Sequence, residues 1–357
     1  MNITILGAGN GGIVASVDLT RRGHDVTLYH TPESNADWDR NQLNDGIKFK
    51  GETVKINKFT QNIEEAIEHA EVIMVTLPTL AIAHYAKEVA PYLKDGQYIY
   101  INGASAMNSM KFMNVVKSEG YNPNVYIGET MSLTYACRYD HTSNEAELIL
   151  TSTHNLFASY PSQHTDHMIE ILKPLYDTLV PAKNILETTL NNGNPESHPG
   201  PAILNTGRID YAGDEFYLYS QGITKHTVRV VEAIDKERQQ ICAALNFEQL
   251  DKSARSERSS YFPKGKTLLE QFNTSPILKD LKGPTTLQNR YIVEDVEEGL
   301  VLWASIGDAV GVDTPVIDSI IHLTGVLLDR NFFEEGLTLS KLGFDGAISP
   351  NTLNNLI

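Results

Sequence analysis

Three glycines near the N-terminus, Gly7, Gly9 and Gly12, have the G-x-G-x-x-G spacing that binds the pyrophosphate of a dinucleotide. Each missing side chain has a purpose, because Gly7 permits a tight turn, Gly9 lets the pyrophosphate touch the backbone, and Gly12 lets a helix pack on a strand. The N–H groups at the start of that helix would then face the phosphates. We assign Asn10 and Gly11, which lie inside the loop, to the same cofactor site.

The context of the glycines supports this interpretation, since the spacing alone is weak evidence. A β-branched run at residues 2–6 precedes them, and a helix-like stretch at 13–22 follows. Gly23 stands where a helix often ends, and residues 24–29 read as a second strand. The N-terminus is therefore predicted to form a βαβ unit that binds a dinucleotide.

Two further loops should border the cofactor, because ligands bind at the carboxyl ends of parallel strands. Leu77 and Pro78 follow the strand expected at 72–77, and residues 102–104 follow the next strand. We assign Leu77 and Pro78 to the cofactor site.

The end of the second strand should carry an acid that binds the ribose, yet Tyr29, His30 and Thr31 stand there. Glu33 is near enough to curl inward, but His30, Thr31 and Ser34 would tolerate a 2′-phosphate better than a carboxylate would. We therefore assign His30 and Thr31 to the cofactor and expect NADP rather than NAD.

Strands and helices alternate in the first half of the chain, which predicts a doubly wound, mostly parallel α/β sheet of the Rossmann type. Helices are expected at 63–69, 80–93, 109–118 and 165–178, and strands at 47–50, 54–57, 72–77, 98–102 and 125–128, with 147–151 and 155–160 extending the same sheet. The pattern then changes to long helices at 225–245, 296–310 and 316–328, while the polar stretch 252–266 reads as a mobile surface loop. We predict a dinucleotide-binding domain at 1–188 and an all-α substrate domain at 189–357.

Composition limits the classes of partner. The formal net charge of −16 disfavours binding to nucleic acid or an anionic membrane, because Lys and Arg cluster only in 252–266. Cys137 and Cys242 lack the spacing of a metal or redox site, and no His/Cys cluster suggests a metal. The first strand leaves no room for a signal peptide. We expect a cytoplasmic protein acting on small molecules, with a homodimer as the default assembly.

Three segments carry a more specific signal: 127–138 (IGETMSLTYACR), 194–208 (NPESHPGPAILNTGR) and 289–296 (NRYIVEDV). Together with the glycine fingerprint they resemble the octopine/nopaline, or opine, dehydrogenase family over nearly the whole chain. The resemblance implies a Rossmann domain joined to a helical domain, with substrate in the cleft between them. It also implies that a 2-oxo acid such as pyruvate condenses with the amino group of an amino acid, and that a nicotinamide hydride then reduces the imine.

The same resemblance implies roles for individual residues. His198 is similar to the family's acid/base histidine, and Asp295 to the carboxylate that orients it. Arg290 resembles the cation that holds a substrate carboxylate. Two further residues, Thr130 and Asn194, resemble positions near the substrate, and Glu129 is assigned to the cofactor.

Each of the three catalytic candidates also has a structural interpretation. His198 stands between Ser197 and Pro199, where it would be a solvated loop histidine. Asp295, with Glu298 three residues later, has the spacing of a helix cap. Arg290 would be one half of a surface ion pair.

Two other functions share the dinucleotide-binding half. One is a carbonyl reductase of the ketopantoate reductase or glycerol-3-phosphate dehydrogenase type, which would use a catalytic lysine, with Lys225 as the nearest candidate. The other is a catalytically idle, dinucleotide-sensing protein. An amine-dependent reaction would separate the opine dehydrogenase hypothesis from both.

Overall fold

The computed structural model describes residues 1–32, 43, 45–103, 106–346 and 348–357. The chain divides into two compact units, Met1–Thr188 and Thr189–Ile357. Each unit has its own architecture.

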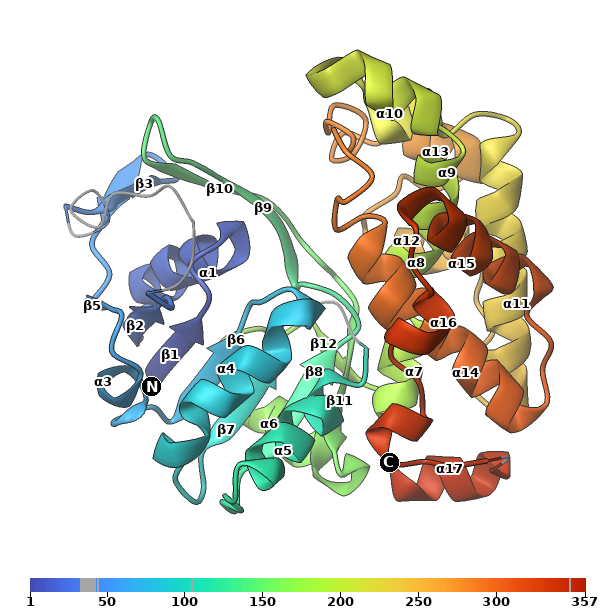
Figure 1. The fold of residues 1–357 in the computed structure, drawn as a ribbon. Helices are drawn as coiled ribbons and strands as arrows, with labels where there is room; N and C mark the ends of the chain where they lie inside the picture. The colour runs from blue at the N-terminus through green and yellow to red at the C-terminus, as the bar shows by residue number, and fades with distance from the viewer. Residues whose placement is uncertain (33–42, 44, 104–105, 347) are drawn as a thin grey trace. The chain divides into compact units, whose positions relative to one another are not determined.

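An eight-stranded sheet forms the centre of the first unit (Figure 1). All neighbouring strands are parallel except β8 and β11, which pair antiparallel. This confirms the expected doubly wound, mostly parallel fold. In the order in which they pair, the strands are β12 (Leu179–Pro181), β11 (Asn155–Tyr160), β8 (Tyr126–Thr130), β7 (Tyr98–Ile101), β6 (Val72–Val75), β1 (Asn2–Leu6), β2 (Asp25–Tyr29) and β5 (Lys58–Thr60).

Helices cover both faces of this sheet, which explains why almost every residue of its central strands is buried. Ile3 and Ile5 of β1 pack in one core cluster with residues of α1 (Asn10–Arg21) and α6 (Thr165–Leu172). Leu6 packs in the opposite cluster, whose helical members come from α3 (Ile63–Ile67), α4 (Ile82–Val89) and α5 (Asn108–Ser118). Successive side chains of β1 point to opposite faces of the sheet and therefore pack in two different cores.

A second sheet of four strands lies apart from the first, in the order β4 (Glu52–Val54), β3 (Ile47–Phe49), β10 (Glu145–Thr151), β9 (Tyr135–Asp140). The prediction that 147–151 extends the main sheet was wrong. Exposed residues alternate with more buried ones along β10, as in a strand with one solvated face, and such a strand does not suit a sheet covered on both sides. The strand expected at 54–57 is also wrong, because Val54 ends β4 and β5 starts at Lys58.

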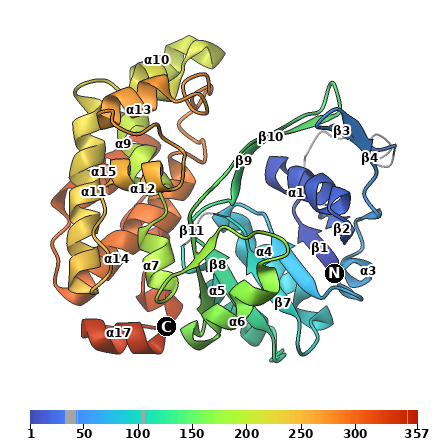
Figure 2. The same cartoon turned by 180° about the vertical axis from the view of Figure 1, so that it is seen from behind.

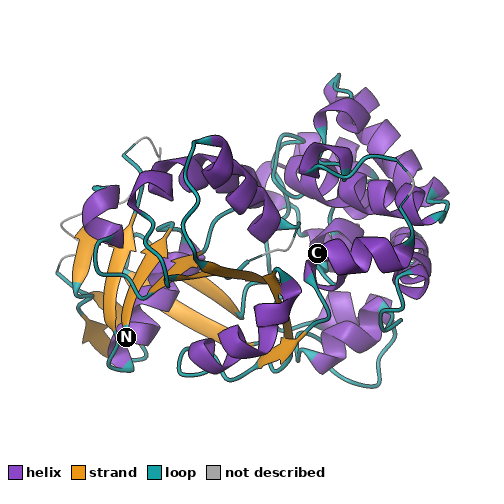
Figure 3. Ribbon diagram, turned by 90° about the horizontal axis from the view of Figure 1, so that it is seen from below, coloured by secondary structure: helices purple, strands orange, loops and turns teal. Residues whose placement is uncertain are grey.

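The second unit contains only helices among the residues that the structure describes (Figure 3). Its longest helix, α11 (Thr227–Ala244), packs against α9, α14 and α15 (Figure 2). The stripe predicted on α11 is buried, at Val228, Val231, Ile234 and Ile241. The remaining elements from α7 onward are α7 (Ile185–Leu190), which crosses the boundary between the units, α8 (Asn194–Ser197), α9 (Pro199–Ile203), α10 (Thr206–Ala212), η4 (Gly213–Glu215), η5 (Leu218–Gly222), α12 (Lys252–Arg258), α13 (Leu268–Thr274), η6 (Asp295–Leu300), α14 (Val301–Val310), α15 (Pro315–Leu328), α16 (Phe332–Glu335), η7 (Ser340–Leu342) and α17 (Pro350–Leu356).

The first part of the stretch 252–266 is helix α12, so the prediction of a surface loop was wrong there. Asp251 caps the helix, since its side chain accepts a hydrogen bond from the backbone N–H of Ala254 at 2.8 Å. Lys252 and Arg255 are buried. Their polarity reflects interior ion pairs rather than exposure to solvent. No described helix is both long and apolar enough to cross a membrane.

Candidate functional site

The glycine loop has the geometry that its sequence predicts. Gly7 has φ +103°, which favours glycine, and an added Cβ would lie 2.6 Å from Cδ2 of Leu77. An added Cβ on Gly12 would collide with the carbonyl oxygen of Gly7 and lie 2.8 Å from the Thr76 hydroxyl. Leu77 therefore lies against the glycine turn, and these two positions accept only glycine without a shift in the loop.

Gly9 differs, because a Cβ there would meet no atom within 4 Å and the residue is exposed. It is the N-cap of α1, with no side-chain cap and no acidic residue in the first turn. The positive end of the helix dipole is thus left without a competing carboxylate. The loop fits the pyrophosphate of a dinucleotide.

Asn10 and Gly11 connect this loop to the second sheet. The side-chain oxygen of Asn10 accepts a hydrogen bond from the N–H of Tyr139 at 3.0 Å, and the carbonyl of Gly11 accepts one from the Tyr135 hydroxyl at 3.0 Å. These contacts give both residues a structural role in holding β9 against the start of α1.

The end of β2 carries an acid that the local sequence does not reveal. The hydroxyls of Tyr29 and Thr31 lie 3.3 and 3.4 Å from the carboxylate oxygens of Glu88, which comes from α4. His30 is buried, and burial lowers its pKa. His30 is therefore a poor source of positive charge at neutral pH. Glu33 and Ser34 lie outside the described residues.

The other site residues predicted in the first unit differ in their burial and in their partners. Glu129 is fully buried and accepts a hydrogen bond from the N–H of Ser109 at 2.5 Å, near the start of α5. The Thr130 hydroxyl is also buried and donates to the carbonyl of Ile101 at 3.3 Å. Pro78, by contrast, is exposed at the end of the β6 loop. Ala104 of the neighbouring loop lies outside the described residues.

His198 stands at the junction of α8 and α9, where it ends one short helix and precedes the other. Prolines 195 and 199 occupy the first turns of the two helices, and the N–H of His198 donates to the carbonyl of Asn194 at 3.0 Å. The imidazole is 6% exposed, so the interpretation as a solvated loop histidine was wrong.

Three side chains enclose the imidazole. Its Nδ1 lies 2.7 Å from Oδ2 of Asp295, and its Nε2 lies 2.7 Å from the hydroxyl of Tyr219. The ring of Tyr291 stacks on it at 4.1 Å between centroids, with 20° between the planes. Tyr219 and Tyr291 were not predicted. The sequence could have indicated Tyr291, because this residue lies in the 289–296 segment. Tyr219 lies outside every motif.

Asp295 opens η6, a π-helical turn, and does not act as a helix cap. The helix already includes earlier residues, because the N–H of Asp295 donates to the carbonyl of Arg290 at 3.4 Å. The capping interpretation was therefore wrong, and the carboxylate faces His198. The guanidinium of Arg290 is about half exposed and lies 3.5 Å from Glu294.

A close approach of η6 and α8 brings the carboxylate to the imidazole. An added Cβ on Gly299 would lie 2.6 Å from Cγ and 3.0 Å from Cβ of Pro195. Because a proline ring has little freedom to move, the missing side chain at Gly299 sets the spacing of these two segments.

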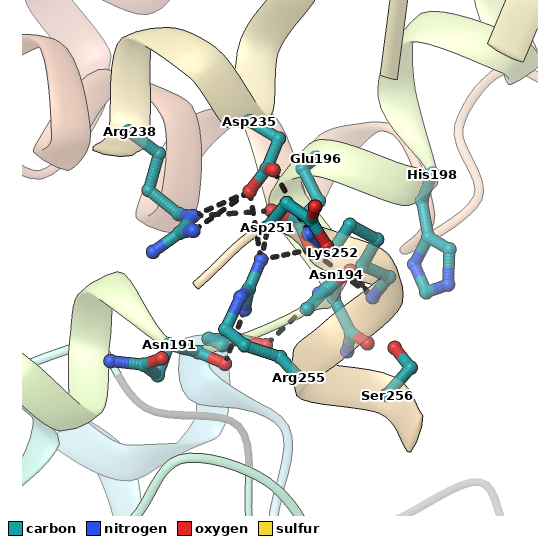
Figure 4. A network of polar contacts seen from close by, with 12 residues as sticks. Asn191, Asn194, Glu196, His198, Asp235, Arg238, Asp251, Lys252, Arg255 and Ser256 are labelled. Atoms are coloured by element: carbon teal, nitrogen blue, oxygen red, sulfur yellow. Dashed lines mark hydrogen bonds and ion pairs between the residues drawn. The ribbon is translucent and has the colours of Figure 1, made fainter. Parts of the chain in front are cut away.

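A buried ion network holds the backbone that leads to His198 (Figure 4). Glu196 is fully buried, and its two carboxylate oxygens lie 2.6 and 2.5 Å from Nη2 of Arg255. Arg238 and Lys252 approach the same carboxylate at 3.5 and 3.1 Å. Asp235 accepts from Arg238 and Arg255. In Figure 4, His198 and Glu196 lie on the same segment of the chain, and the ring of His198 points away from the ion network.

The cations of the network also bind backbone carbonyls just before α8. Arg238 donates to Leu190 at 3.2 Å, Arg255 to Asn191 at 3.1 Å and Lys252 to Gly193 at 3.1 Å. The segment preceding the histidine is thus fixed by charge-assisted hydrogen bonds.

The surroundings shift the pKa values of two ionisable groups in the network, Asp235 and Lys252. Burial alone would raise the pKa of Asp235, but Arg238 and Arg255 outweigh it and the pKa is lowered. Burial lowers the pKa of the Lys252 ammonium, although Glu196 opposes the shift. Asp235 therefore stays ionised in the folded protein.

Both cysteines are buried, and burial raises the pKa of the Cys137 thiol to about 12. Within the described part of the chain, no group of three or more His, Cys, Asp or Glu could hold a metal ion.

Comparison with known proteins identifies the class. Residues 2–128 match the model of the N-terminus of NAD-dependent glycerol-3-phosphate dehydrogenase, and residues 181–328 match the α-helical domain of NAD/NADP octopine/nopaline dehydrogenase. The fold is similar to that of octopine dehydrogenase in complex with NADH and agmatine (TM-score 0.77, 18% identity, 99% of this chain and 98% of that one). It is also similar to NADP+-bound yersinopine dehydrogenase (TM-score 0.69, 16% identity, 99% and 97%). The protein is an NAD(P)-dependent oxidoreductase that acts on CH–NH donors.

The opine dehydrogenase of Arthrobacter sp. (strain 1C) is 30% identical over 345 residues, which are 96% of this chain and 95% of that protein. The chain belongs to the octopine/nopaline, or opine, dehydrogenase family, as its motifs suggested. It is an opine dehydrogenase-like enzyme, and the carbonyl-reductase and sensor alternatives have less support.

Proposed function

We propose that the protein joins a pyruvate-like 2-oxo acid to the amino group of an amino acid, with His198 and Asp295 as its acid–base pair. The observation that carries this proposal is the 2.7 Å contact between Nδ1 of His198 and Oδ2 of Asp295 in a buried setting. A carboxylate on Nδ1 holds the imidazole in one tautomer and leaves Nε2 to exchange protons.

The first unit would hold the cofactor through the glycine turn, with Gly9 open to the pyrophosphate and Leu77 against Gly7. When bound there, a nicotinamide cofactor supplies the hydride that reduces the imine carbon. The further neighbours that we propose for the cofactor are Asn10, Gly11, His30, Thr31, Pro78 and Glu129.

The second unit would supply the proton chemistry. As the amine adds to the carbonyl of the oxo acid, Nε2 of His198 gives up its hydrogen bond with the Tyr219 hydroxyl and accepts a proton from the nitrogen. The imidazolium, stabilised by Asp295, returns this proton to the oxygen of the adduct, which gives the carbinolamine. The one further proton that the reaction consumes then lets this oxygen leave as water. The net reaction consumes one oxo acid, one amine, one reduced cofactor and one proton, and yields a secondary amine, water and the oxidised cofactor. Arg290, whose guanidinium is about half exposed, would bind a substrate carboxylate, with Thr130 and Asn194 as further substrate contacts.

We propose that NADH is preferred, against the sequence-based expectation of NADPH. Glu88 lies within hydrogen-bonding distance of Thr31, directly after β2, where a carboxylate suits the ribose hydroxyls and repels a 2′-phosphate. His30 is buried with a lowered pKa and offers no compensating charge. Glu88→Gln should raise kcat/KM for NADPH relative to NADH by about tenfold, and the control Glu119→Gln should not. An unchanged ratio in Glu88→Gln would remove Glu88 from the explanation.

We propose a homodimer, the default assembly, in the cytoplasm. The two buried cysteine thiols support the compartment and say nothing of the assembly. Light scattering during size exclusion should give twice the 39.6 kDa mass of the chain, and cell fractionation should recover the protein with the cytoplasm.

The test of the reaction is a screen of 2-oxo acids against amino acids with both reduced cofactors. We expect cofactor oxidation to require an oxo acid and an amine together. Oxidation that proceeds equally well without any amine would favour the carbonyl-reductase alternative.

A further inference from the structure

We infer that Tyr219 is a positioning residue, whose hydroxyl holds the Nε2 side of His198 in both protonation states of the imidazole. This inference rests on the proposed acid–base role of His198.

The hydroxyl is placed to bond with either state. It lies 2.7 Å from Nε2, and the Tyr219 ring is 4% exposed. With the Nδ1 proton directed at Asp295, a neutral imidazole accepts the tyrosine O–H at Nε2. After Nε2 gains a proton, the hydroxyl accepts it instead, because a hydroxyl can donate or accept by turning its hydrogen alone. Nε2 thus has a hydrogen-bonding partner before it takes up the substrate's proton and again once it carries that proton.

Tyr219 is itself held from behind. Its ring stacks on Phe272 of α13 with 14° between the planes, and the side-chain amide of Asn273 donates to the carbonyls of Tyr219 and Ile223 at 2.6 and 3.0 Å. These contacts clamp η5, the π-helical turn that carries Tyr219. Asp295 also stands on a π-helical turn, so both hydrogen-bonding partners of the imidazole come from widened turns, which are frequent at functional sites.

The groups that face the imidazole determine the sign of the effect. Asp295 of η6 is the charged one, while Tyr219 of η5 and the stacked Tyr291 are neutral. A hydrogen bond to a charged donor is stronger than one between neutral groups. Removing the hydroxyl should therefore disfavour the protonated imidazole more than the neutral one.

The experiment is Tyr219→Phe, which keeps the stacked ring and removes one oxygen. We expect kcat to fall about tenfold, with little change in KM for the cofactor. The limb of the kcat/KM profile that reports imidazole protonation should move by roughly 0.5 to 1 pH unit toward lower pH. The matched control is Tyr217→Phe, two residues away, whose ring lies near Lys282. It should leave the profile in place.

A second measurement does not depend on the substrate. Nitrogen NMR of histidine-labelled protein, assigned with His198→Gln, should show the same downward shift of the His198 titration in Tyr219→Phe. Should that variant not fold, Asn273→Leu keeps the hydroxyl but loosens its turn and should move the titration in the same direction. An unmoved titration would overturn the positioning role. If the titration moves in Tyr219→Phe but the wild-type enzyme shows no amine-dependent turnover, only the proposed reaction would be overturned.

Discussion

Oδ2 of Asp295 lies 2.7 Å from Nδ1 of His198, although 97 positions separate the two residues in the chain. Both side chains are largely buried, so the pair is shielded from competing water. A carboxylate in this place orients the imidazole and stabilises its charged form.

Asp295→Asn should leave the contact geometry nearly intact and remove the charge that the imidazolium needs. We expect kcat/KM to fall by about 100-fold or more, as is typical for losing a general acid–base partner. Steady-state kinetics with saturating cofactor checks this. The exposed Asp308→Asn on α14 serves as control, and equal activity of the two variants would contradict the role of Asp295.

Gly299→Ala should push η6 away from α8, because its new Cβ would lie 2.6 Å from the ring of Pro195. Displacing Asp295 from His198 should cost about 10- to 100-fold in kcat. The control is Gly207→Ala on α10, where a Cβ meets nothing within 4 Å and helix propensity improves. Activity of Gly299→Ala at the level of the control would show that the close approach does not set the pair.

Two arginines on the same helix, α12, permit a matched test of the buried network. Arg255 binds the fully buried Glu196, whereas Arg258 pairs with the exposed Glu248. Arg255→Met should cost about 1–3 kcal/mol of unfolding free energy, because the buried Glu196 loses the donor that contacts both of its carboxylate oxygens, although Arg238 and Lys252 still neutralise its charge. Arg258→Met should cost at most about 1 kcal/mol. Denaturant unfolding measures both, and equal losses would refute a structural role for the network.

Stability should fall in acid partly through Asp235. Its pKa is lowered in the folded protein from the ordinary value of 3.8, so the unfolded chain takes up the proton first as the pH falls. The contribution of Asp235 is complete above about pH 5 and is lost as the pH falls through its lowered folded pKa. Asp235→Asn should be less stable at neutral pH and lose less stability between about pH 5 and 3. Melting temperatures across this range test the sign, with the exposed Asp280→Asn expected to behave as wild type.

The sequence predicted those parts of the molecule in which each residue's role is local. Gly7 and Gly12 are needed by the turn itself, and the alternation of strands and helices follows from burial on both faces of the sheet. His198 and Asp295 were paired through the family resemblance, since nothing in the spacing of two distant residues predicts a 2.7 Å contact.

The parts that the sequence did not predict depend on tertiary partners. Lys252 and Arg255 look like solvated loop residues until Glu196 and Asp235 are placed beside them. Glu88 reaches the end of β2 from a helix more than fifty residues later, so the local segment showed no acid. Tyr219 stands on a π-helical turn, which has no periodic signal in the sequence.

The most direct measurement is the amine-dependent turnover of His198→Asn together with its affinity for the reduced cofactor. We predict that cofactor affinity, followed by fluorescence, stays within about twofold of wild type, because the glycine loop is untouched, while kcat falls by about 100-fold or more. A His198→Asn enzyme that binds cofactor normally and turns over at the wild-type rate would contradict the account.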